Sequence, residues 1–461
     1  MNRADVIVVG GGLAGISAAL ACADAGADVT LLESRNRLGG LTYSWRRGDV
    51  TVDNGQHVFL RCCTAYRALL ERLGVTRLTE LQDRLDIPVL STPDGRRARL
   101  RRVGLPSPLH LGPALLRYRP LRPRQRLSAV RAALALSHVE RGAAASDQST
   151  FADWLRAHGQ DEWTVAALWD LVGTATLNAR ADQASLALAA MVFQVGLLGE
   201  PDAADIGWSR VPLQRLHGDA AHDRLRVAGA KVRTSARATR VELDGRGWLV
   251  VAGGEEHSAE HVVVAVPPTA AEALLPAGAI DATPGWSAQL GQAPIVNVHI
   301  VLGERVLDEP FLAVVGSPLQ WIFDRTEAAG LAHGQYLALS ISAADGYIDQ
   351  PVARLREIFL PELARVLPAT AGARLVDFFV TRERAATIRS APGHAALRAP
   401  ARTARPGLVL AGAWTDTGWP DTMEGAVRSG QTAARIVLGE SPAQSLPAAH
   451  HARGPGGEVA T

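Results

Sequence analysis

Cysteine is scarce in this sequence, and its arrangement argues against two kinds of site. The 461 residues contain three cysteines, Cys22, Cys62 and Cys63, and two of these are neighbours. An odd number without CxxC spacing supports neither a disulfide framework nor a zinc site. We therefore expect a protein of a reducing, cytoplasmic setting that holds no metal.

Long hydrophobic runs are also lacking. No uncharged stretch of about 18 residues occurs, and the opening MNRADVIVVGGG has no apolar segment followed by a cleavage site. The sequence thus predicts neither a membrane span nor a signal peptide. With 47% hydrophobic and 20% charged residues, the composition is that of a globular protein with a sizeable core.

Positive charge is carried almost wholly by arginine and is unevenly spread. Lys231 is the single lysine, and the formal net charge is only +2. Residues 84–131 nevertheless contain twelve arginines against two acids, Asp86 and Asp94. Such a run is either a solvated surface or a surface that binds an anionic partner.

The start of the chain has the pattern of a dinucleotide-binding fold. A short β-branched run, a glycine turn and apolar residues at helical spacing follow one another. In such a turn Gly10 permits the tight bend, Gly12 lets a pyrophosphate approach the backbone, and Gly15 lets the helix pack on the strand. The helix N-terminus then directs N–H groups at the phosphates. Glu33 ends a second apolar run, where an acid binds the adenosine ribose.

A second pair of glycines follows and indicates the cofactor. The stretch from Arg35 through Gly39 and Gly40 resembles the flavin amine oxidase and phytoene desaturase superfamily rather than the nicotinamide dehydrogenases. The resemblance implies FAD. Members of that superfamily usually carry arginine after the glycine pair, where this sequence has Leu41, so one expected contact is missing. The FAD contacts implied for this part of the chain are Gly10, Gly12, Leu13, Ala14, Gly15, Glu33, Ser34, Arg35, Gly39, Gly40 and Leu41.

A polar group of residues interrupts the strand-like segment VDNGQHVFL. Its form, Asp53-x-Gly55-x-His57, resembles one subgroup of the superfamily, the squalene-associated hydroxysqualene dehydroxylases. The resemblance implies that this segment lies beside the isoalloxazine, with Asn54, Gly55, Gln56 and His57 at the flavin. A β-turn in which Asp53 and Asn54 bond their own backbone is the alternative.

The far end of the chain repeats the order of strand, loop and helix. An apolar run ends in Gly412, and the TGWPDTMEGAVRSG that follows is close to the hydroxysqualene group. The resemblance implies a helix start that faces the flavin pyrimidine, where negative charge gathers on reduction. The acid usual in this motif is replaced by Ala413, and Asp416 is our candidate to take its role. The FAD contacts implied here are Gly412, Asp416, Thr422, Met423 and Ala426.

The middle of the chain predicts a discontinuous arrangement. We expect an α/β fold in which a Rossmann-like FAD-binding domain carries a discontinuous α+β substrate-binding lobe, as in flavin amine oxidases. Residues 1–80, 208–289 and 386–440 would form the FAD-binding domain, and residues 81–207 and 290–385 the substrate-binding lobe. Val241 falls at the position that usually lies beside the adenine. Residues 441–461, rich in alanine, proline and glycine, predict a disordered tail.

Two inner segments, WIFDR and NARADQAS, also look like the hydroxysqualene group. Together with the C-terminal motif they imply substrate contacts by Asn178, Trp321, Phe323 and Trp419. Plain core packing is the alternative for Trp321 and Phe323, because aromatic side chains usually serve burial. A helix cap is the alternative for Asn178.

The arginine-rich block that begins at Arg96 and ends at Arg131 also contains many leucines, among them Leu109 and Leu116. No nucleic-acid recognition module accompanies the charge, which argues against nucleic acid as a partner. An anionic membrane fits better, since arginines attract headgroups while leucines enter the interface. We therefore expect a cytoplasmic protein that is peripheral to the inner face of the membrane.

The resemblance implies the reduction of hydroxysqualene, an apolar isoprenoid, to squalene for hopanoid or related triterpene supply. Reduced flavin would deliver hydride to the carbon that loses its hydroxyl, and the departing hydroxyl needs a proton. His57, whose ordinary pKa is about 6.5, is the first candidate donor, and Asp324 is the second; a backbone hydrogen bond is the alternative role for His57. No second GxGxxG occurs, so the electron donor is expected to be external or to bind without that motif.

Two other classes of protein stay open. Carotenoid desaturases, amine oxidases and protoporphyrinogen oxidases would share the FAD motifs while hydride moves from substrate to flavin. A prenyl-binding chaperone of the GDP-dissociation-inhibitor type would use a related fold without flavin. The retained FAD motifs argue against the chaperone.

Overall fold

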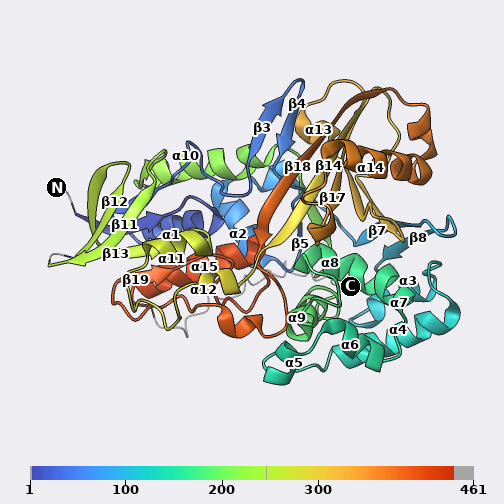
Figure 1. Cartoon of the computed structure of the whole chain (residues 1–461), viewed down its shortest axis with the longest axis horizontal. Coiled ribbons are helices and arrows are strands. Elements are labelled where there is room, and N and C mark those ends of the chain that lie inside the picture. The colour runs from blue at the N-terminus through green and yellow to red at the C-terminus, as the bar shows by residue number, and fades with distance from the viewer. Residues whose placement is uncertain (1–2, 246, 441–461) are drawn as a thin grey trace, which may run out of the picture.

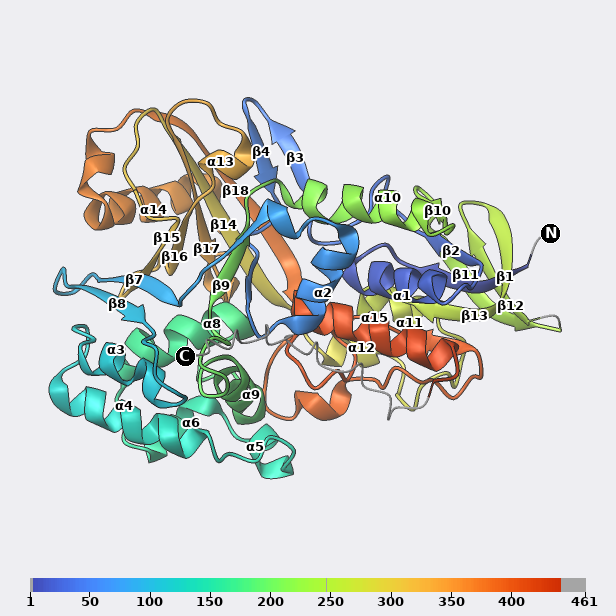
Figure 2. The same cartoon turned by 180° about the vertical axis from the view of Figure 1, so that it is seen from behind.

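The computed structural model describes residues 3–245 and 247–440 and has two lobes (Figure 1). The N-terminal strand lies in one lobe, and the helices of residues 112–157 lie toward the opposite end of the molecule (Figures 1 and 2). The chain passes between the lobes several times, so each lobe combines segments that are far apart in sequence. The disordered tail predicted for residues 441–461 lies outside the described residues.

The first lobe is built on a seven-stranded sheet whose parallel centre comes from three separate parts of the chain. β1 pairs in parallel with β2 on one side and with β13 on the other, and β19 continues the parallel centre beyond β13. β11 and β12 add an antiparallel edge. The strands are β1 (Ala4–Val9), β2 (Val29–Leu32), β10 (Lys231–Arg233), β11 (Ala238–Asp244), β12 (Gly247–Ala252), β13 (Glu255–Val264) and β19 (Leu408–Leu410).

Apolar side chains cover both faces of this sheet, because its parallel centre is enclosed by helices. In β1, Val6 and Val8 face the core shared with α1, α2, α10 and α15, whereas Ile7 and Val9 face the core shared with α11 and α12. This double burial explains the continuous β-branched run at the start of the sequence. The helices are α1 (Leu13–Asp24), α2 (Thr64–Leu73), α10 (Ala220–Val227), α11 (Pro268–Leu274), α12 (Trp286–Gln289) and α15 (Met423–Val437).

The second lobe contains another seven-stranded sheet, in the order β18-β14-β17-β16-β15-β7-β8. Its pairs are antiparallel except that between β15 and β7. α14 (Val352–Val366) covers one face, where Phe359 and Leu363 share a buried core with Val298 and Ile300. The strands are β7 (Asp86–Ser91), β8 (Arg97–Arg101), β14 (Ala293–Leu302), β15 (Phe311–Val315), β16 (Trp321–Asp324), β17 (Gln335–Ile341) and β18 (Leu375–Thr387).

Helices and two small β-structures complete the second lobe and the junction. The helices are α3 (Gly112–Leu116), α4 (Pro123–Leu136), α5 (Ala144–Gln148), α6 (Phe151–Ala157), α7 (Glu162–Thr164), α8 (Asp170–Leu177), α9 (Leu186–Gly196) and α13 (Thr326–Ala329). β3 (Ser44–Arg47) and β4 (Val50–Asp53) form a hairpin, and β5 (Val58–Leu60), β9 (Ile206–Ser209) and β6 (Thr79–Leu81) form a three-stranded sheet. Within the described residues, no helix has both the length and the hydrophobicity needed to cross a bilayer.

The small three-stranded sheet lies where the sequence places domain boundaries. The predicted divisions between residues 80 and 81 and between 207 and 208 fall inside β6 and β9. β6 and β5 both pair with β9. The chain therefore crosses between the lobes within this sheet, whose strands pair with one another, and not at single residues.

The two glycine-rich ends of the chain meet where α15 crosses α1. A Cβ atom at Gly430 of α15 would lie well inside van der Waals contact with the Ala14 carbonyl oxygen and 2.8 Å from the Ser17 Cβ. The Ser17 hydroxyl also donates to the Val427 carbonyl at 3.1 Å. This close approach brings the N-terminal glycine turn beside the start of α15, although more than 400 residues separate them in sequence.

We predict that Gly430→Ala destabilises the protein, because the added methyl group must push α15 away from α1. Overpacking of this kind costs about 1–3 kcal/mol in the free energy of unfolding, to be measured by urea denaturation. Gly173→Ala in α8 is the matched control, since a Cβ there meets nothing within 4 Å and alanine favours a helix by up to about 1 kcal/mol. Equal effects of the two substitutions would contradict the close crossing.

Candidate functional site

In the first glycine turn the space beside Gly12 is open to a phosphate, whereas the space beside Gly10 and Gly15 is filled by neighbouring backbone. Cβ atoms at Gly10 and Gly15 would collide with the carbonyl oxygens of Ala265 and Gly10, so these glycines are required by packing. At Gly12 the nearest atom would be the Gly40 Cα, 3.8 Å away. Gly12 is also the N-cap of α1 and provides no side-chain cap, so the first N–H groups of the helix have no intrahelical acceptor. The turn therefore fits a pyrophosphate.

The second glycine pair lies directly against the first turn. The Gly39 N–H donates to the Gly11 carbonyl at 2.8 Å, and a Cβ at Gly40 would lie 2.9 Å from the Gly12 Cα. Two glycine segments thus form one cradle in which backbone packs closely on backbone and Gly12 and Gly40 stay half-buried, and such side-chain-free backbone is what a bound dinucleotide requires. Leu41, the departure from the usual arginine, is 41% exposed beside this cradle.

Glu33 is buried and is tied to the glycine turn. One carboxylate oxygen accepts the Gly11 N–H at 2.7 Å, and the other accepts the Arg35 N–H at 2.7 Å and the Ser34 hydroxyl at 3.1 Å. The acid therefore stands at the end of β2 beside the turn, where a ribose contact is expected. Its contact with the ribose stays a prediction, as does that of Val241, which is buried in the core beneath the antiparallel edge.

The C-terminal motif forms a loop and helix start held by a buried arginine. Gly412 has a φ of +147°, and a Cβ there would collide with the Trp414 indole. Arg398, which the sequence did not single out, donates to the backbone carbonyls of Ala413, Trp414 and Trp419. Asp416, proposed to replace the missing acid, is exposed. Hydrogen bonds from Arg398, which lies outside the motif, therefore position the backbone of this loop.

The start of α15 is shaped by a cap and a buried carboxylate. The Thr422 hydroxyl accepts the Gly425 N–H at 3.3 Å. Glu424, which the sequence did not identify, is 1% exposed and accepts the backbone N–H groups of Ala65 and Tyr66 at 3.1 and 2.7 Å. Its charge thus lies at the N-terminus of α2, where the helix dipole favours an anion.

Asp53 pairs with a distant arginine. Its carboxylate lies 2.8 Å from a guanidinium nitrogen of Arg325, and both residues are buried. It also accepts the Ser44 hydroxyl at 2.6 Å and the Leu213 N–H at 2.9 Å. Arg325 donates further to the Ser209 carbonyl. This side chain therefore joins the two lobes, and the predicted alternative of a turn bonded to its own backbone does not describe it.

His57 is placed as a neutral imidazole. Burial lowers its pKa from the ordinary 6.5, and the nearby charge of Arg325 adds to this; the hydrogen bond to Gly55 and the charge of Asp53 oppose it. A neutral ring whose Nδ1 lies 3.1 Å from the Gly55 carbonyl oxygen donates through Nδ1. Its Nε2 is then an acceptor, so the ring in this state has no proton to give through that atom.

Asp324 is occupied as an acceptor. Its two oxygens accept the N–H and hydroxyl of Thr326, the side-chain amide of Gln335 at 2.8 Å and the guanidinium of Arg305 at 2.9 Å. His57 and Asp324 do meet, at a small cavity that they line together. Neither lines the large cavity described next, which is evidence against both as the proton donor to a molecule bound there.

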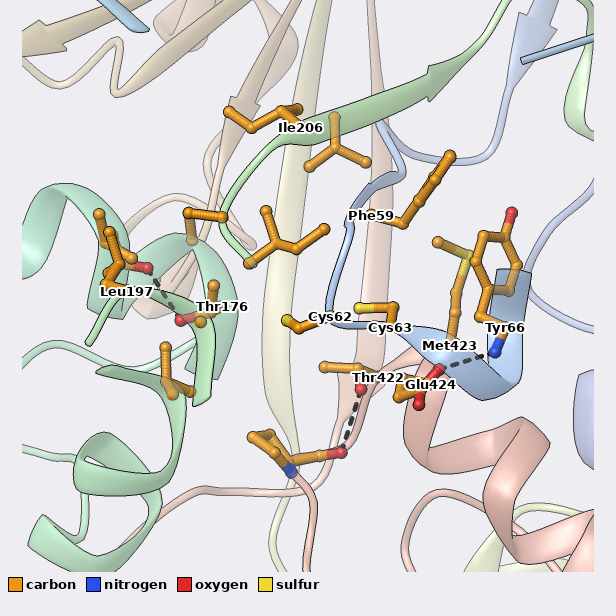
Figure 3. A pocket seen from close by; sticks show the side chains of 18 of the residues that line it. Phe59, Cys62, Cys63, Tyr66, Thr176, Leu197, Ile206, Thr422, Met423 and Glu424 are labelled. Atoms are coloured by element: carbon orange, nitrogen blue, oxygen red, sulfur yellow. Dashed lines mark hydrogen bonds between the residues drawn. The ribbon is translucent and has the colours of Figure 1, made fainter. Parts of the chain in front are cut away.

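A large apolar cavity of about 240 Å³ lies between the two lobes (Figure 3). Its wall is supplied by β5, the start of α2, α8, α9, the open face of the second sheet and the start of α15. Figure 3 shows Cys62, Cys63, Thr422 and Met423 gathered along one side. Most of the wall is aliphatic or aromatic. A cavity of this composition suits a hydrophobic molecule.

Three of the four predicted substrate contacts line this cavity, namely Trp321, Phe323 and Trp419. Asn178 does not. It is the left-handed C-cap of α8, with a φ of 50°, and its amide bonds the Ala293 carbonyl and the Ala343 N–H. The structure thus supports the alternative of a helix cap for Asn178, at the C-terminus of the helix.

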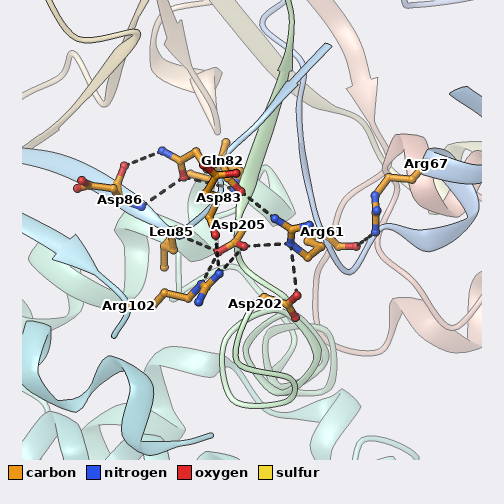
Figure 4. A network of polar contacts seen from close by, with 10 residues as sticks. Arg61, Arg67, Gln82, Asp83, Leu85, Asp86, Arg102, Asp202 and Asp205 are labelled. Carbon is orange, nitrogen blue, oxygen red and sulfur yellow. Dashed lines mark hydrogen bonds and ion pairs between the residues drawn. The ribbon is translucent and has the colours of Figure 1, made fainter. Parts of the chain in front are cut away.

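One end of the cavity wall is fixed by a buried acid (Figure 4). Asp205 accepts hydrogen bonds from Arg61 at 3.0 Å, from Arg102 at 2.6 and 2.8 Å and from the Leu85 N–H at 2.7 Å. Leu85 and the neighbour of Asp205, Ala204, line the cavity. No set of three or more potential metal ligands gathers anywhere in the residues that the structure describes.

Comparison with known proteins agrees with these features. A sequence model of the family described as flavin containing amine oxidoreductase matches residues 13–438. The hydroxysqualene dehydroxylase of Rhodopseudomonas palustris is 29% identical over 442 residues, covering 94% of this chain and 98% of that protein. A 15-cis-phytoene desaturase of Narcissus pseudonarcissus is 24% identical, with coverage of 94% and 79%. The structure of cyclohexylamine oxidase from Brevibacterium oxydans IH-35A has a TM-score of 0.69 at 22% identity, over 95% of this chain and 99% of that one. The predicted fold class is confirmed.

We predict that Arg325→Met strongly destabilises the protein, because it leaves the Asp53 carboxylate buried without its countercharge. Removing one partner of a buried pair costs about 3–5 kcal/mol in the free energy of unfolding. Adding Asp53→Asn should recover part of this loss, since the double variant buries no charge. Urea denaturation of the three proteins measures both effects.

The matched control is Arg210→Met, which breaks an exposed pair with Glu327. Exposed pairs contribute about 1 kcal/mol or less. If Arg325→Met cost no more than Arg210→Met, Asp53 and Arg325 would not act as a buried pair.

Proposed function

The chain belongs to the family of flavin-containing amine oxidoreductases and is an FAD-dependent enzyme, and on this premise we propose that it reduces hydroxysqualene to squalene. The observation that carries the proposal is the apolar cavity, whose wall includes three residues expected at the flavin, namely Gln56, Thr422 and Met423. An apolar molecule in this cavity would therefore lie next to the cofactor. The similarity to hydroxysqualene dehydroxylases over almost the whole chain supports the choice of substrate.

The residues of the glycine cradle would hold the FAD pyrophosphate, and the loop before α15 would hold the flavin. Bound FAD, once reduced, would supply the hydride for the new carbon–hydrogen bond, and the hydroxyl would take up one proton and leave as water. The chain itself would exclude water, because the aromatic rings of Phe311, Trp321 and Phe323 line the cavity and little polar surface would surround a bound substrate. Electrons reach FAD from an external donor.

A membrane contact completes the proposal. Leu105, Leu109, Leu116, Leu127 and Leu134 are 45–60% exposed, in and beside α3 and α4. Around them stand exposed arginines that have no carboxylate within ion-pair distance among the described residues. These are Arg97, Arg117, Arg119, Arg122, Arg124 and Arg131. Unpaired positive charge among exposed leucines suits an anionic bilayer, where each arginine contributes about 1 kcal/mol of attraction.

Other apolar residues of the same block have a different role. Tyr118 and Leu121 are buried, and the Tyr118 hydroxyl donates to the Ala167 carbonyl. They anchor α3 and α4 to the body of the lobe. We call the exposed leucines and unpaired arginines the arginine–leucine surface. The buried side chains of Tyr118 and Leu121 hold this surface in place on the lobe.

We predict that the purified, anaerobically reduced protein is reoxidised by hydroxysqualene with formation of squalene. Flavin absorbance follows the reoxidation, and mass spectrometry identifies the product. Gly12→Asp is the control: aspartate is a good N-cap for α1, but its carboxylate stands where the pyrophosphate must lie. This variant should fold, lack FAD and give no squalene.

A flavin that stays reduced in the presence of hydroxysqualene would contradict the proposed direction. Oxidised protein would then be offered isoprenoids such as phytoene, since phytoene desaturases also resemble this chain. A colourless wild-type protein would contradict FAD itself.

We predict that the protein binds vesicles of anionic lipid at low salt and that Leu109→Asp with Leu116→Asp abolishes this binding. Each substitution puts a charge where an apolar side chain would enter the interface. Leu243→Asp, at an equally exposed leucine of β11 in the other lobe, is the control and should sediment with the vesicles as the wild type does. Failure of the wild type to sediment would overturn the membrane contact.

A further inference from the structure

Two serine hydroxyls in the cavity wall have no hydrogen-bond partner within the part of the chain that the structure describes. Ser340 is the next-to-last residue of β17, Ser342 lies just after that strand, and both line the large cavity. No hydrogen bond with the described residues involves either hydroxyl, and neither oxygen is sealed from solvent. Ser342 as a whole is only 7% exposed, so its opening lies at the cavity that it lines. A molecule bound in the cavity can therefore reach both hydroxyls.

The two serines face the same side of the second sheet. Side chains alternate along a strand, and Ile341, which lies between the serines, is buried in the core that α14 covers. Residues two apart in a strand are separated by about 7 Å. A hydroxyl that bonds two others at about 2.7–2.8 Å each spans about 5.5 Å, and rotation about the Cα–Cβ bonds of the serines closes the difference. One alcohol group can thus accept from one serine and donate to the other.

Ser340 lies near the segment that is predicted to contact the flavin. In the sheet it pairs with Asn297 of β14, and the side chains of such a pair stand about 5 Å apart. The Asn297 amide donates to the Asn54 carbonyl at 3.4 Å, and a Cβ at Gly55 would lie 3.7 Å from the same amide nitrogen. On its other side Ser340 pairs with Trp321, a predicted substrate contact that lines the cavity. A hydroxyl held at Ser340 would therefore lie toward the cofactor.

Most other polar groups of the wall are already paired within the protein. The Tyr66 hydroxyl shares a hydrogen bond of 2.7 Å with the His217 Nε2. The Thr176 hydroxyl donates back to carbonyls of its own helix. Thr422 caps α15, and Glu424 accepts N–H groups at the start of α2 (Figure 3). None of these groups is left over for a ligand.

The remaining polar groups of the wall are less suited to an alcohol than the serines are. The Cys62 and Cys63 thiols hydrogen-bond to each other, and a thiol is a weak donor and acceptor. The indoles of Trp321 and Trp419 can only donate. A serine hydroxyl both donates and accepts, so two serines can satisfy an alcohol group completely.

We propose that the Ser340 and Ser342 hydroxyls form the subsite that binds the hydroxyl group of the isoprenoid alcohol, an inference that rests on the proposed function. Apolar contact is non-directional, so an almost wholly apolar wall does not fix how far along the cavity a long hydrocarbon chain lies. Two hydrogen bonds at one end do fix this, and they place the carbon that carries the hydroxyl toward the flavin.

The same subsite distinguishes the substrate from the product. Squalene has no oxygen, so it leaves both serines without a partner from the ligand. A site that hydrogen-bonds a hydroxyl disfavours the analogue that lacks it. Because water can reach these serines, the preference is smaller than at a sealed site. The subsite therefore favours release of the hydrocarbon and binding of the next alcohol.

The test compares the affinities of oxidised, FAD-loaded protein for hydroxysqualene and for squalene. The oxidised protein cannot reduce either molecule, so equilibrium binding is measured by the change in flavin absorbance in dilute detergent. We expect the wild type to bind the alcohol about tenfold more tightly, as hydrogen bonds between neutral groups allow. Ser340→Ala with Ser342→Ala should bind the alcohol about tenfold more weakly than the wild type does, and squalene no more weakly. Each single variant should lose part of the preference.

A kinetic measurement tests the placement of the reacting carbon. When saturated with hydroxysqualene, the reduced double variant should be reoxidised more slowly than the wild type, because no hydrogen bond then sets the position of the chain. Thr176→Val is the matched control for both measurements, since this wall hydroxyl is already paired with its own helix. It should keep the tenfold preference.

Several results would overturn the proposal. A double variant that keeps the preference would assign the hydroxyl to another group, and one that is reoxidised at the full rate would show that the serines do not place the carbon. If the double variant lost FAD, the single variants would decide, and the subsite fails when neither lowers the preference. Wild type that converts hydroxysqualene but binds both molecules equally would overturn the role of the serines and leave the proposed function intact. Wild type that neither binds nor converts hydroxysqualene would overturn both.

Discussion

The crossing of α15 over α1 is the contact on which the site depends. Both helices begin at segments that are predicted to bind FAD, one at the first glycine turn and one at the C-terminal motif, and their axes approach closely because Gly430 presents no side chain to Ala14. Larger residues at this crossing would hold the two helices apart. The two motifs could not then contact the same ligand. The cradle of Gly12 and Gly40 is built on the same support, since Gly12 begins α1.

Buried carboxylates then fix the parts of the molecule that the sheets do not join. Asp53 pairs with Arg325 across the lobes, Glu424 binds the start of α2 to the start of α15, and Asp205 binds three segments at the end of the cavity. Each acid is surrounded by donors, so its burial does not leave an uncompensated charge. These carboxylates and their donors bind one another between the segments. The cavity wall between them can therefore be almost wholly apolar, which suits an isoprenoid.

Sequence reasoning predicted the fold class and the cofactor from local signals, and the comparisons confirm both. The glycine turn, the second glycine pair and the C-terminal motif are each short runs of neighbouring residues. Even so, the structure fits Gly10 against Ala265 and holds the C-terminal loop by hydrogen bonds from Arg398, outside the motif. Sequence reasoning failed where the partner was distant: nothing near Asp53 announces Arg325, 272 residues away, and nothing near Glu424 announces the start of α2. His57 and Asp324 were plausible acids by residue type, but a side chain's protonation and neighbours are set by packing. Asn178 was recognisable as a possible cap, yet its left-handed backbone became evident only in the fold.

If the arginine–leucine surface binds a membrane as proposed, the way it is attached to the lobe sets the route of an insoluble substrate to the cavity. Gln194 of α9 donates to the carbonyls of Leu136 and Val139 at the end of α4, and the Ser107 hydroxyl donates to the Leu198 carbonyl just after α9. α9 also supplies Met191, Val192 and Val195 to the cavity wall. One helix thus borders the cavity on one side and supports the exposed leucines on the other. A molecule that leaves a lipid surface docked at α3 and α4 would pass only the thickness of this layer and would not cross water. Its long hydrocarbon chain would not be exposed to water on the way, which avoids the unfavourable free energy of hydrating it.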